Sequence, residues 1–384
     1  MGEENPDSHV IGDLKKLSTP WKIALERANR IKNIDLGEGF ILDLACGSGI
    51  QLAAYSFQLN KPCIGIEINS ERAEIAKKSL NLILNNDFAK YSKIIIGDSL
   101  KKSEIKLDSD IRFSLIHLDP ARPTDIQSHT LSEMQPPPIE TLNLWKDLLI
   151  EKGAIILDLS PRLSKVQCKT LQNELAKILP NYEQTWEWSS QGRGRVDRLS
   201  VWLGSVASKN KSSRYVRNHP QNIEKSIIVE ANKLPWDYSD SKLTDINVNI
   251  GDYISIIDPA LISSGLEDIW LKSQKFEGVW IRKNGRRPLF VHSQKINHSR
   301  KEEGLIFESG IIRSIIKHDI NEGVDPLIEI GNKLEMKKLT LRLKMMPELQ
   351  PKFQSKLDKN LIDWGGIGFV IKLPDDRLAV CTKI

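Results

Sequence analysis

The sequence predicts an α/β fold for the first half of the chain and a smaller α+β domain after it. Short apolar runs alternate with segments of helical periodicity from residue 41 to residue 158. This alternation is typical of a largely parallel sheet. The first three runs each carry a carboxylate at the end, and the first leads into a glycine-rich turn.

The first strand and the turn after it are the most informative stretch. Residues 41–44 are apolar apart from Asp43, a helix is predicted over 51–59, and between them stand Ala45, Cys46, Gly47, Ser48 and Gly49. Glycines allow the backbone to turn tightly and approach a ligand, and a helix N-terminus offers free amide groups. A dinucleotide-binding turn would carry a third glycine at Leu52. The turn therefore predicts a pocket for a nucleoside rather than a pyrophosphate.

The second and third strands supply further carboxylates. Residues 63–67 end in Glu67 and residues 94–98 end in Asp98, which precedes Ser99. Glu67 follows Asp43 by one strand-helix-strand unit, which suits a carboxylate that bonds two ribose hydroxyls, and Asn69 begins the next helix. The alternative is that each acidic residue caps the helix after it. Three such residues after one glycine turn favour a shared crevice.

The fourth strand, residues 113–119, ends in Asp119 and runs into Pro120, which prohibits a regular continuation. Asp119 is a candidate for positioning a reacting group and accepting its proton. Arg122 could hold a phosphate or carboxylate with two parallel hydrogen bonds, or serve only as a surface or capping residue. His117 shares a strand face with Asp119, and we expect it to be a packed structural histidine.

The same sheet is predicted to continue. A helix over 139–152 precedes a fifth strand over 154–158, and a hairpin is predicted from residues 182–188 and 199–203. Upstream, Pro20 begins a helix over 21–31, which we expect to lie across the mouth of the pocket. Trp21 is expected to pack there, the alternative being contact with the ligand.

Length and composition predict two domains. The chain has 384 residues and 40% hydrophobic content, and its whole net charge of +5 arises after residue 205. We expect domains at 1–206 and 221–384, joined by a basic polar linker at 207–220. The four cysteines are scattered, which supports neither a metal site nor disulfides and suggests a reducing cytoplasm. Neither a signal peptide nor a membrane span is predicted, and the oligomeric state is not indicated.

The second domain is predicted to be α+β and basic. Its expected elements include a strand before Pro259, a helix over 260–272 and two closing strands near the C-terminus. Basic clusters occur at 282–287, 295–301 and 337–344, with aromatic residues among them. Such clusters are typical of a phosphate-binding face, the alternative being an ordinary solvated surface.

In order along the chain, the helix after Thr19 and Pro20, the glycine turn, the segment 117–122, the hairpin between Trp186 and Trp202 and the turn-helix at 258–265 resemble one family. They are similar to class I S-adenosylmethionine-dependent methyltransferases with a C-terminal THUMP-like domain. The resemblance implies a Rossmann-like sheet of seven strands with an antiparallel terminal hairpin, followed by a smaller α+β THUMP-like domain. It also implies S-adenosylmethionine as cofactor.

The resemblance implies roles for particular residues. The catalytic residues would be Asp119, which would hold the acceptor, and Arg122, which would grip a phosphate. The residues expected around the cofactor are Asp43, Ala45, Cys46, Gly47, Ser48, Gly49, Glu67, Asn69, Asp98, Ser99 and Asp119. Compared with class I methyltransferases that act on nitrogen, Ala121 and Arg122 replace a proline and an aromatic residue. Compared with the proteins that carry a THUMP-like domain, Pro123 stands where a second arginine is common.

The function expected from these features is methylation of a base nitrogen in tRNA or rRNA, since true THUMP domains bring tRNA to modifying enzymes. The partner would be RNA, and no membrane association is expected. One alternative is a methyltransferase that acts on protein or a small molecule, with Arg122 binding a carboxylate. The other is a noncatalytic RNA-binding protein that retains the cofactor site.

Overall fold

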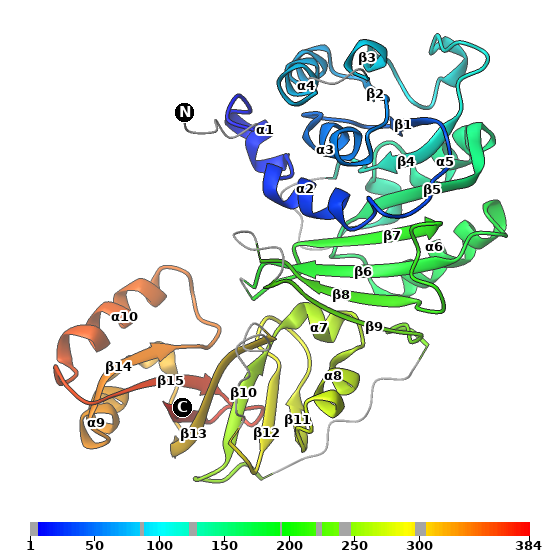
Figure 1. The fold of residues 1–384 in the computed structure, drawn as a ribbon. Coiled ribbons are helices and arrows are strands. Elements are labelled where there is room, and N and C mark those ends of the chain that lie inside the picture. The colour runs from blue at the N-terminus through cyan, green and yellow to red at the C-terminus, as the bar shows by residue number, and fades with distance from the viewer. Residues whose placement is uncertain are drawn as a thin grey trace. The chain divides into compact units, whose positions relative to one another are not determined.

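A computed structural model of the protein describes residues 7–84, 88–122, 129–192, 194–219, 225–237, 247–295 and 305–384 (Figure 1). The chain forms two compact units. Unit 1 runs to Tyr238, except that Gly192–Val196 group with unit 2, and unit 2 continues from Ser239 to Ile384.

Unit 1 is built on a nine-stranded sheet with the order β3-β2-β1-β4-β5-β7-β6-β8-β9. Strands β1 to β5 are mutually parallel, and β7 runs antiparallel to both β5 and β6. The bounds are β1 Phe40–Asp43, β2 Cys63–Glu67, β3 Lys93–Ile96, β4 Phe113–Leu118, β5 Leu149–Leu159, β6 Gln184–Ser190, β7 Arg198–Gly204, β8 Ser213–Arg217 and β9 Ile227–Ala231. The strand order reverses between β1 and β4, where ligands bind in open α/β sheets.

Two predictions about this sheet were wrong. The sheet has nine strands rather than seven, because β8 pairs with β6 in parallel and β9 pairs with β8. The expected linker at 207–220 contains β8, so the division between the units falls later, near Tyr238. The charged residue Arg214 made this segment look like an exposed linker. It can be buried in β8 because it forms ion pairs with Glu187 and Glu230.

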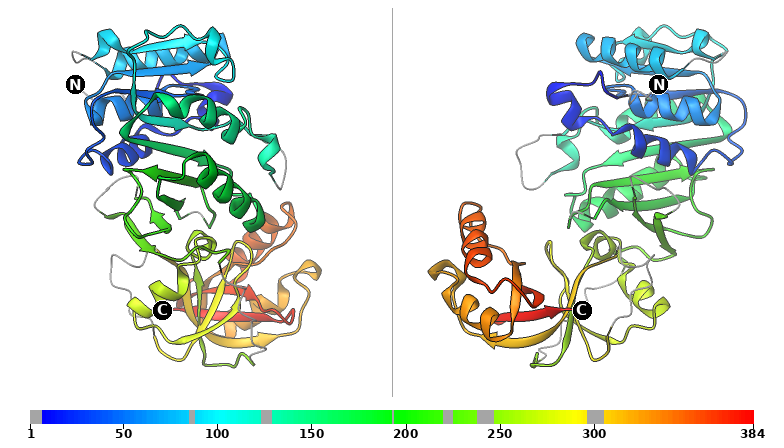
Figure 2. Two further views of the ribbon diagram at one scale, coloured as in Figure 1. Left: turned by 90° about the vertical axis from the view of Figure 1, so that its right-hand side faces the viewer. Right: turned by 60° about the vertical axis from the view of Figure 1, so that its left-hand side comes forward.

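Helices cover both faces of the sheet. The bounds are α1 Gly12–Leu17, α2 Trp21–Asn29, α3 Ile50–Leu59, α4 Ser70–Ile83, α5 Pro138–Trp145 and α6 Lys165–Ile178. Residues of α2, α3 and α4 share one hydrophobic core with the inner strands, whereas α5 and α6 lie on the other face (Figure 2). The helix expected over 139–152 is shorter, because β5 already begins at Leu149.

Unit 2 is α+β, as the sequence predicts. Its seven-stranded sheet has the order β11-β12-β10-β13-β16-β15-β14, antiparallel except between β14 and β15. The strands are β10 Tyr253–Ile257, β11 Gly278–Arg282, β12 Leu289–His292, β13 Ile306–Ile316, β14 Met336–Leu341, β15 Gly366–Lys372 and β16 Leu378–Lys383.

The helices of unit 2 are α7 Pro259–Ser263, α8 Glu267–Ser273, α9 Asp325–Lys333 and α10 Leu349–Asn360. The single helix predicted over 260–272 is two helices, because Gly265 adopts a φ of +71° between them. Helices α9 and α10 pack on β14. Among the described residues, no helix is long and apolar enough to cross a membrane.

Candidate active site

Four carboxylates lie where adjacent strands of unit 1 end. Asp43 closes β1, Glu67 closes β2, Asp98 follows β3 and Asp119 follows β4. These strands are neighbours and parallel, so their carboxyl ends share one edge of the sheet. The tertiary structure thereby brings together residues that the sequence places in four separate segments.

The two glycines of the turn have different roles. Gly49 is the N-cap of α3 with a φ of +74°, and a Cβ there would lie 2.9 Å from the Cα of Ala76 in α4. Gly49 therefore permits α3 and α4 to pack closely. Gly47 has a φ of +54°, yet a Cβ there would meet nothing within 4 Å. Gly47 thus borders open space on the side where a ligand could lie.

Glu67 is fixed against this turn. It accepts hydrogen bonds from the backbone N–H of Gly47 at 2.9 Å and of Asn69 at 3.0 Å. Ile68 follows it and is 69% exposed, which is unusual for a large apolar side chain next to a buried strand. An exposed apolar residue therefore directly follows the carboxylate that accepts from the N–H of Gly47.

The remaining predicted cofactor residues are partly committed to local structure. The side chain of Asn69 caps α4 by accepting from the N–H of Arg72. Asp98 is half-buried and accepts from the N–H of Leu100, and the carbonyl of Ser99 accepts from the indole of Trp145. Among the described residues, no side-chain hydrogen bond joins Asp98 or Ser99 to the glycine turn. Asn69 thus caps a helix and Asp98 stabilises a turn, which are local roles of the kind that the sequence allowed as an alternative to ligand binding.

The segment before α2 contacts the glycine turn. Ser18 and Ser48 share a hydrogen bond of 2.7 Å, and the carbonyl of Ser48 accepts from Ser79 of α4. Trp21 packs edge-on against Phe57 of α3, in agreement with the packing role expected for it. Burial raises the pKa of the Cys46 thiol well above its ordinary value, so Cys46 is a neutral part of the turn.

Asp43 is buried and its oxygens are engaged inside the protein. Its Oδ2 lies 2.8 Å from Nδ1 of His117, and its Oδ1 accepts from the N–H of Ala45. The other ring nitrogen, Nε2, lies 3.2 Å from Oδ2 of Asp158. Since both neighbours of the ring are carboxylates, both nitrogens must donate, which only a protonated histidine can do.

The charge state of His117 agrees with this geometry. Burial alone would lower its pKa, but the carboxylates of Asp43 and Asp158 outweigh burial and raise the pKa to about 9. His117 is buried, as expected, and it is also the charged centre of a hydrogen-bonded triad.

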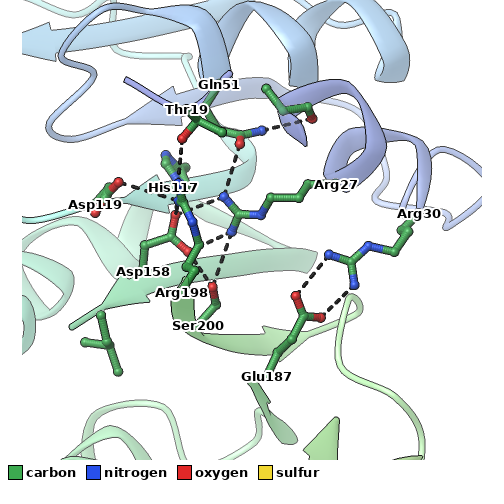
Figure 3. A network of polar contacts seen from close by, with 12 residues as sticks. Thr19, Arg27, Arg30, Gln51, His117, Asp119, Asp158, Glu187, Arg198 and Ser200 are labelled. Carbon is green, nitrogen blue, oxygen red and sulfur yellow. Dashed lines mark hydrogen bonds and ion pairs between the residues drawn. The ribbon is translucent and has the colours of Figure 1, made fainter. Parts of the chain in front are cut away.

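Asp158 is the point where this triad meets three further side chains (Figure 3). Arg27 of α2 binds it with two hydrogen bonds of 2.7 and 2.9 Å. Ser200 donates to it at 2.6 Å, and Arg198 forms an ion pair with it. Burial would raise the pKa of Asp158, but Arg198, Arg27 and His117 hold it well below its ordinary value.

Asp119 and Arg122, the two predicted catalytic residues, form an ion pair with each other. Arg122 donates to Oδ1 of Asp119 at 2.8 Å and to the carbonyl of Leu159 at 2.9 Å. On the other side, Nη1 of Arg198 lies 3.6 Å from Oδ2 of Asp119. The carboxylate is 26% exposed, so it remains accessible between two guanidinium groups.

Arg27, Asp158 and Arg198 are not among the predicted site residues. A signal existed for two of them, since Asp158 ends the predicted fifth strand and Arg198 directly precedes residues 199–203. An antiparallel pair places the end of one strand beside the start of the other. No group of three potential metal-ligating side chains exists among the described residues.

No protein-family model and no curated protein matches the chain. Among solved structures, it resembles a protein from Porphyromonas gingivalis W83 that is provisionally described as a methyltransferase. The two are 17% identical with a TM-score of 0.60, over 96% of this chain and 82% of that one. This likeness supports the predicted α/β fold.

Other solved structures match about half of the chain. The ribosomal protein L11 methylase from Lactobacillus delbrueckii subsp. bulgaricus is 15% identical with a TM-score of 0.31, over 49% of this chain and 77% of that one. The plantazolicin methyltransferase BpumL, in complex with SAH, is 18% identical with a TM-score of 0.35, over 51% and 88%.

Proposed function

We propose that the protein is an S-adenosylmethionine-dependent methyltransferase that modifies a base nitrogen in tRNA or rRNA. The observation that carries this proposal is the arrangement of Glu67, Gly47 and Asp119 at the ends of three adjacent parallel strands. Such an edge can hold a nucleoside at one end and an acceptor group at the other.

The residues around Gly47 suit the nucleoside part of the cofactor. Glu67 uses one lone pair on each oxygen for a backbone N–H, which leaves acceptor capacity for ribose hydroxyls. Ile68 offers an apolar surface for an adenine ring, and Asp98 offers an acceptor for its amino group. Ala45, Cys46, Ser48, Gly49, Asn69 and Ser99 would then shape the pocket through the turn and the two strand ends, with Asp43 acting beneath it through His117.

Asp119 is the proposed catalytic residue. S-adenosylmethionine supplies a methyl group on a sulfonium, and an acceptor nitrogen displaces it in line, so the protein chiefly has to position that nitrogen. Oδ1 and Oδ2 of Asp119 face Arg122 and Arg198, which fixes the orientation of the carboxylate. Asp119 would accept a hydrogen bond from the attacking amino group and thereby direct its lone pair.

The basic character of the chain favours RNA as the substrate. Unit 2 has 25 Lys and Arg residues against 20 Asp and Glu, which accounts for the net charge of +5, and we propose a THUMP-like, RNA-binding role in the cytoplasm for this unit. A protein or small-molecule substrate would explain the site equally well but would leave this charge without a role. In a noncatalytic protein, the placement of Asp119 between Arg122 and Arg198 would have no role.

The test uses purified protein, radiolabelled S-adenosylmethionine and total RNA from a strain that lacks the protein. Asp119→Ala is compared with Asp375→Asn, which removes a carboxylate from an exposed pair with Arg377. Label in a single nucleoside, lost in Asp119→Ala and kept in Asp375→Asn, supports the proposal. Label in protein or small molecules instead of RNA refutes the RNA substrate. Bound cofactor without transfer to any fraction refutes the catalytic role.

A further inference from the structure

Unit 2 contains a group of arginines that its carboxylates do not neutralise. Arg282 ends β11, Arg286 and Arg287 lie in the turn before β12, and Arg342 follows β14. We refer to these four residues as the arginine cluster. They come from two segments that are far apart in the sequence and at opposite ends of the strand order of unit 2, and a hydrogen bond from Arg282 to Lys372 links the first segment to the end of β15, the neighbour of β14.

Backbone carbonyls hold the cluster in place. Arg282 donates from Nε to the carbonyl of Arg287 at 3.1 Å and from Nη1 to the carbonyl of Lys372 at 3.0 Å. The first bond closes the turn on itself, and the second ties it to β15. Both Arg282 and Arg287 are half-buried, and the backbone of Arg287 is held by Arg282, so the side chain of Arg287 has less freedom than that of an exposed arginine.

The only carboxylate that pairs with the cluster among the described residues is Glu308. It accepts from Nε and Nη2 of Arg342 at 3.0 and 2.5 Å, and its other oxygen pairs with Lys383 at 3.0 Å. Arg286 and Arg287 have no ion-pair or hydrogen-bond partner for their guanidinium groups in the described part of the chain. The single carboxylate of Glu308 is therefore too little to neutralise the positive charge of the arginine cluster and Lys383.

The arginines also act on one another. Burial and the charge of Arg287 lower the pKa of Arg282, while burial, Arg342 and Arg286 lower the pKa of Arg287. The arrangement thus contains mutual repulsion between half-buried guanidinium groups. An anion bound between them would relieve it, and a phosphate matches the planar geometry of a guanidinium.

An aromatic ring lies beside the cluster. The guanidinium of Arg342 stands 5.3 Å from the ring centre of Phe307, whose side chain is 39% exposed. Exposed aromatic rings next to cationic side chains bind single-stranded nucleic acid, because every unpaired base has a face that can stack. The bases of a duplex are already stacked on their neighbours.

We propose that the arginine cluster is a binding site for a phosphodiester of single-stranded RNA, with Phe307 as the stacking surface for an adjacent base. Arg287 and Arg286 contact the phosphate, and Arg282 and Glu308 fix the geometry of the site. This inference rests on the proposed RNA substrate, and it assigns the contact to particular residues of unit 2.

The test is fluorescence anisotropy with the full chain and a fluorescein-labelled single-stranded oligouridine, at several potassium chloride concentrations. Arg287→Ala is expected to weaken binding about tenfold, since a charged hydrogen bond to phosphate is lost. The slope of log affinity against log salt should fall by about 0.7 for the lost contact. Phe307→Ala should weaken binding at least about fivefold.

Arg313→Ala is the matched control, because Arg313 is an exposed arginine on β13 of the same unit. Its effect is expected to stay below about twofold at physiological salt, where exposed surface charges are screened. Melting temperature and cofactor affinity show that each variant is folded. Equal weakening by Arg287→Ala and Arg313→Ala overturns the site, as does a wild-type protein that does not bind the oligouridine. A duplex RNA that competes as well as a single strand overturns the assignment to single-stranded RNA.

The two proposals can fail separately. Binding of oligouridine that depends on Arg287, without labelling of any RNA, supports the site and contradicts the methylation proposal. Labelling and binding of RNA that are equal in wild type and Arg287→Ala contradict the site and leave the methylation proposal standing.

Discussion

Arg198 and Asp119 face each other across the edge of the sheet of unit 1, with Nη1 and Oδ2 3.6 Å apart. Arg198 is held from behind by its ion pair with Asp158 and from the side by a hydrogen bond of 2.6 Å from its Nη2 to Thr19. Arg122 donates to Oδ1 of the same carboxylate at 2.8 Å. Arg198 places a second guanidinium at Asp119 from a different strand.

Arg198→Ala should therefore impair catalysis more than cofactor binding. Asp158 would keep Arg27 and His117, so the fold should persist, but Asp119 would lose one of its two flanking cations. We expect kcat on the RNA fraction to fall about 100-fold through misplacement of the acceptor. The cofactor Kd, measured by calorimetry, should change little. Arg377→Ala is the control, and a large rise in the cofactor Kd alone would contradict this role.

Substitutions at the two glycines of the turn should separate stability from binding. Gly49→Ala would press a methyl group against the backbone of Ala76, and we expect it to lower the free energy of unfolding by about 2–4 kcal/mol. Gly47→Ala has room for its methyl group and should lower it by only about 1 kcal/mol, through the positive φ.

For cofactor affinity, Gly47→Ala should have the larger effect of the two substitutions. Gly47→Ala would fill part of the open space beside Glu67, so its cofactor affinity should drop at least about tenfold, as expected when a well-packed contact is obstructed. Urea unfolding and calorimetry measure the two effects. Wild-type affinity in Gly47→Ala would place the ligand elsewhere.

His117 should make the stability depend on alkaline pH. Its pKa of about 9 lies above the ordinary value of 6.5, so protonation of His117 stabilises the folded state. This stabilisation is complete below pH 6.5 and is lost as the pH rises through 9, and the shift corresponds to on the order of 3 kcal/mol. Urea unfolding at pH 6.5 and 9.5 should show the loss in wild type and not in His117→Gln. An equal loss in both proteins would show that other groups titrate.

Glu187 should stabilise the extension of the sheet. It is buried between Arg30 of α2 and Arg214 of β8, at 2.7 and 3.0 Å. Burial would raise its pKa, but the two arginines lower the pKa to about 2. Glu187→Gln leaves both cations without this partner and should reduce the free energy of unfolding by about 3 kcal/mol or more.

Glu74→Gln is the matched control for Glu187→Gln, because Glu74 pairs with Lys77 at 2.6 Å on the exposed side of α4. Such an exposed pair contributes about 0.5 kcal/mol or less, so its loss should be barely measurable. Similar effects of the two substitutions in urea unfolding would mean that the buried pairs of Glu187 contribute no more than a surface pair.

The strands of the first half could be predicted from local sequence. Residues 41–43, 63–67 and 113–118 are short apolar runs with turn residues or helical patterns after them, and burial of both faces leaves such runs little alternative. The positions of Glu67 and Asp119 followed from these strand ends, because parallel strands align their carboxyl ends. Strand β8 could not be predicted in this way, since Arg214 is charged and becomes buried only through Glu187 and Glu230.

The sequence by itself determined the α/β core, the glycine turn and the carboxylates at the strand ends, because these depend on backbone conformation and on the burial of nearby apolar residues. The tertiary structure alone decided which charges neutralise one another. Asp158, Arg27 and Arg198 come from three separate segments and meet only when the helix before the turn closes over the sheet. Their pairing depends on distances that no local pattern encodes, since a buried charge is tolerated only where its partner has been placed within hydrogen-bonding reach.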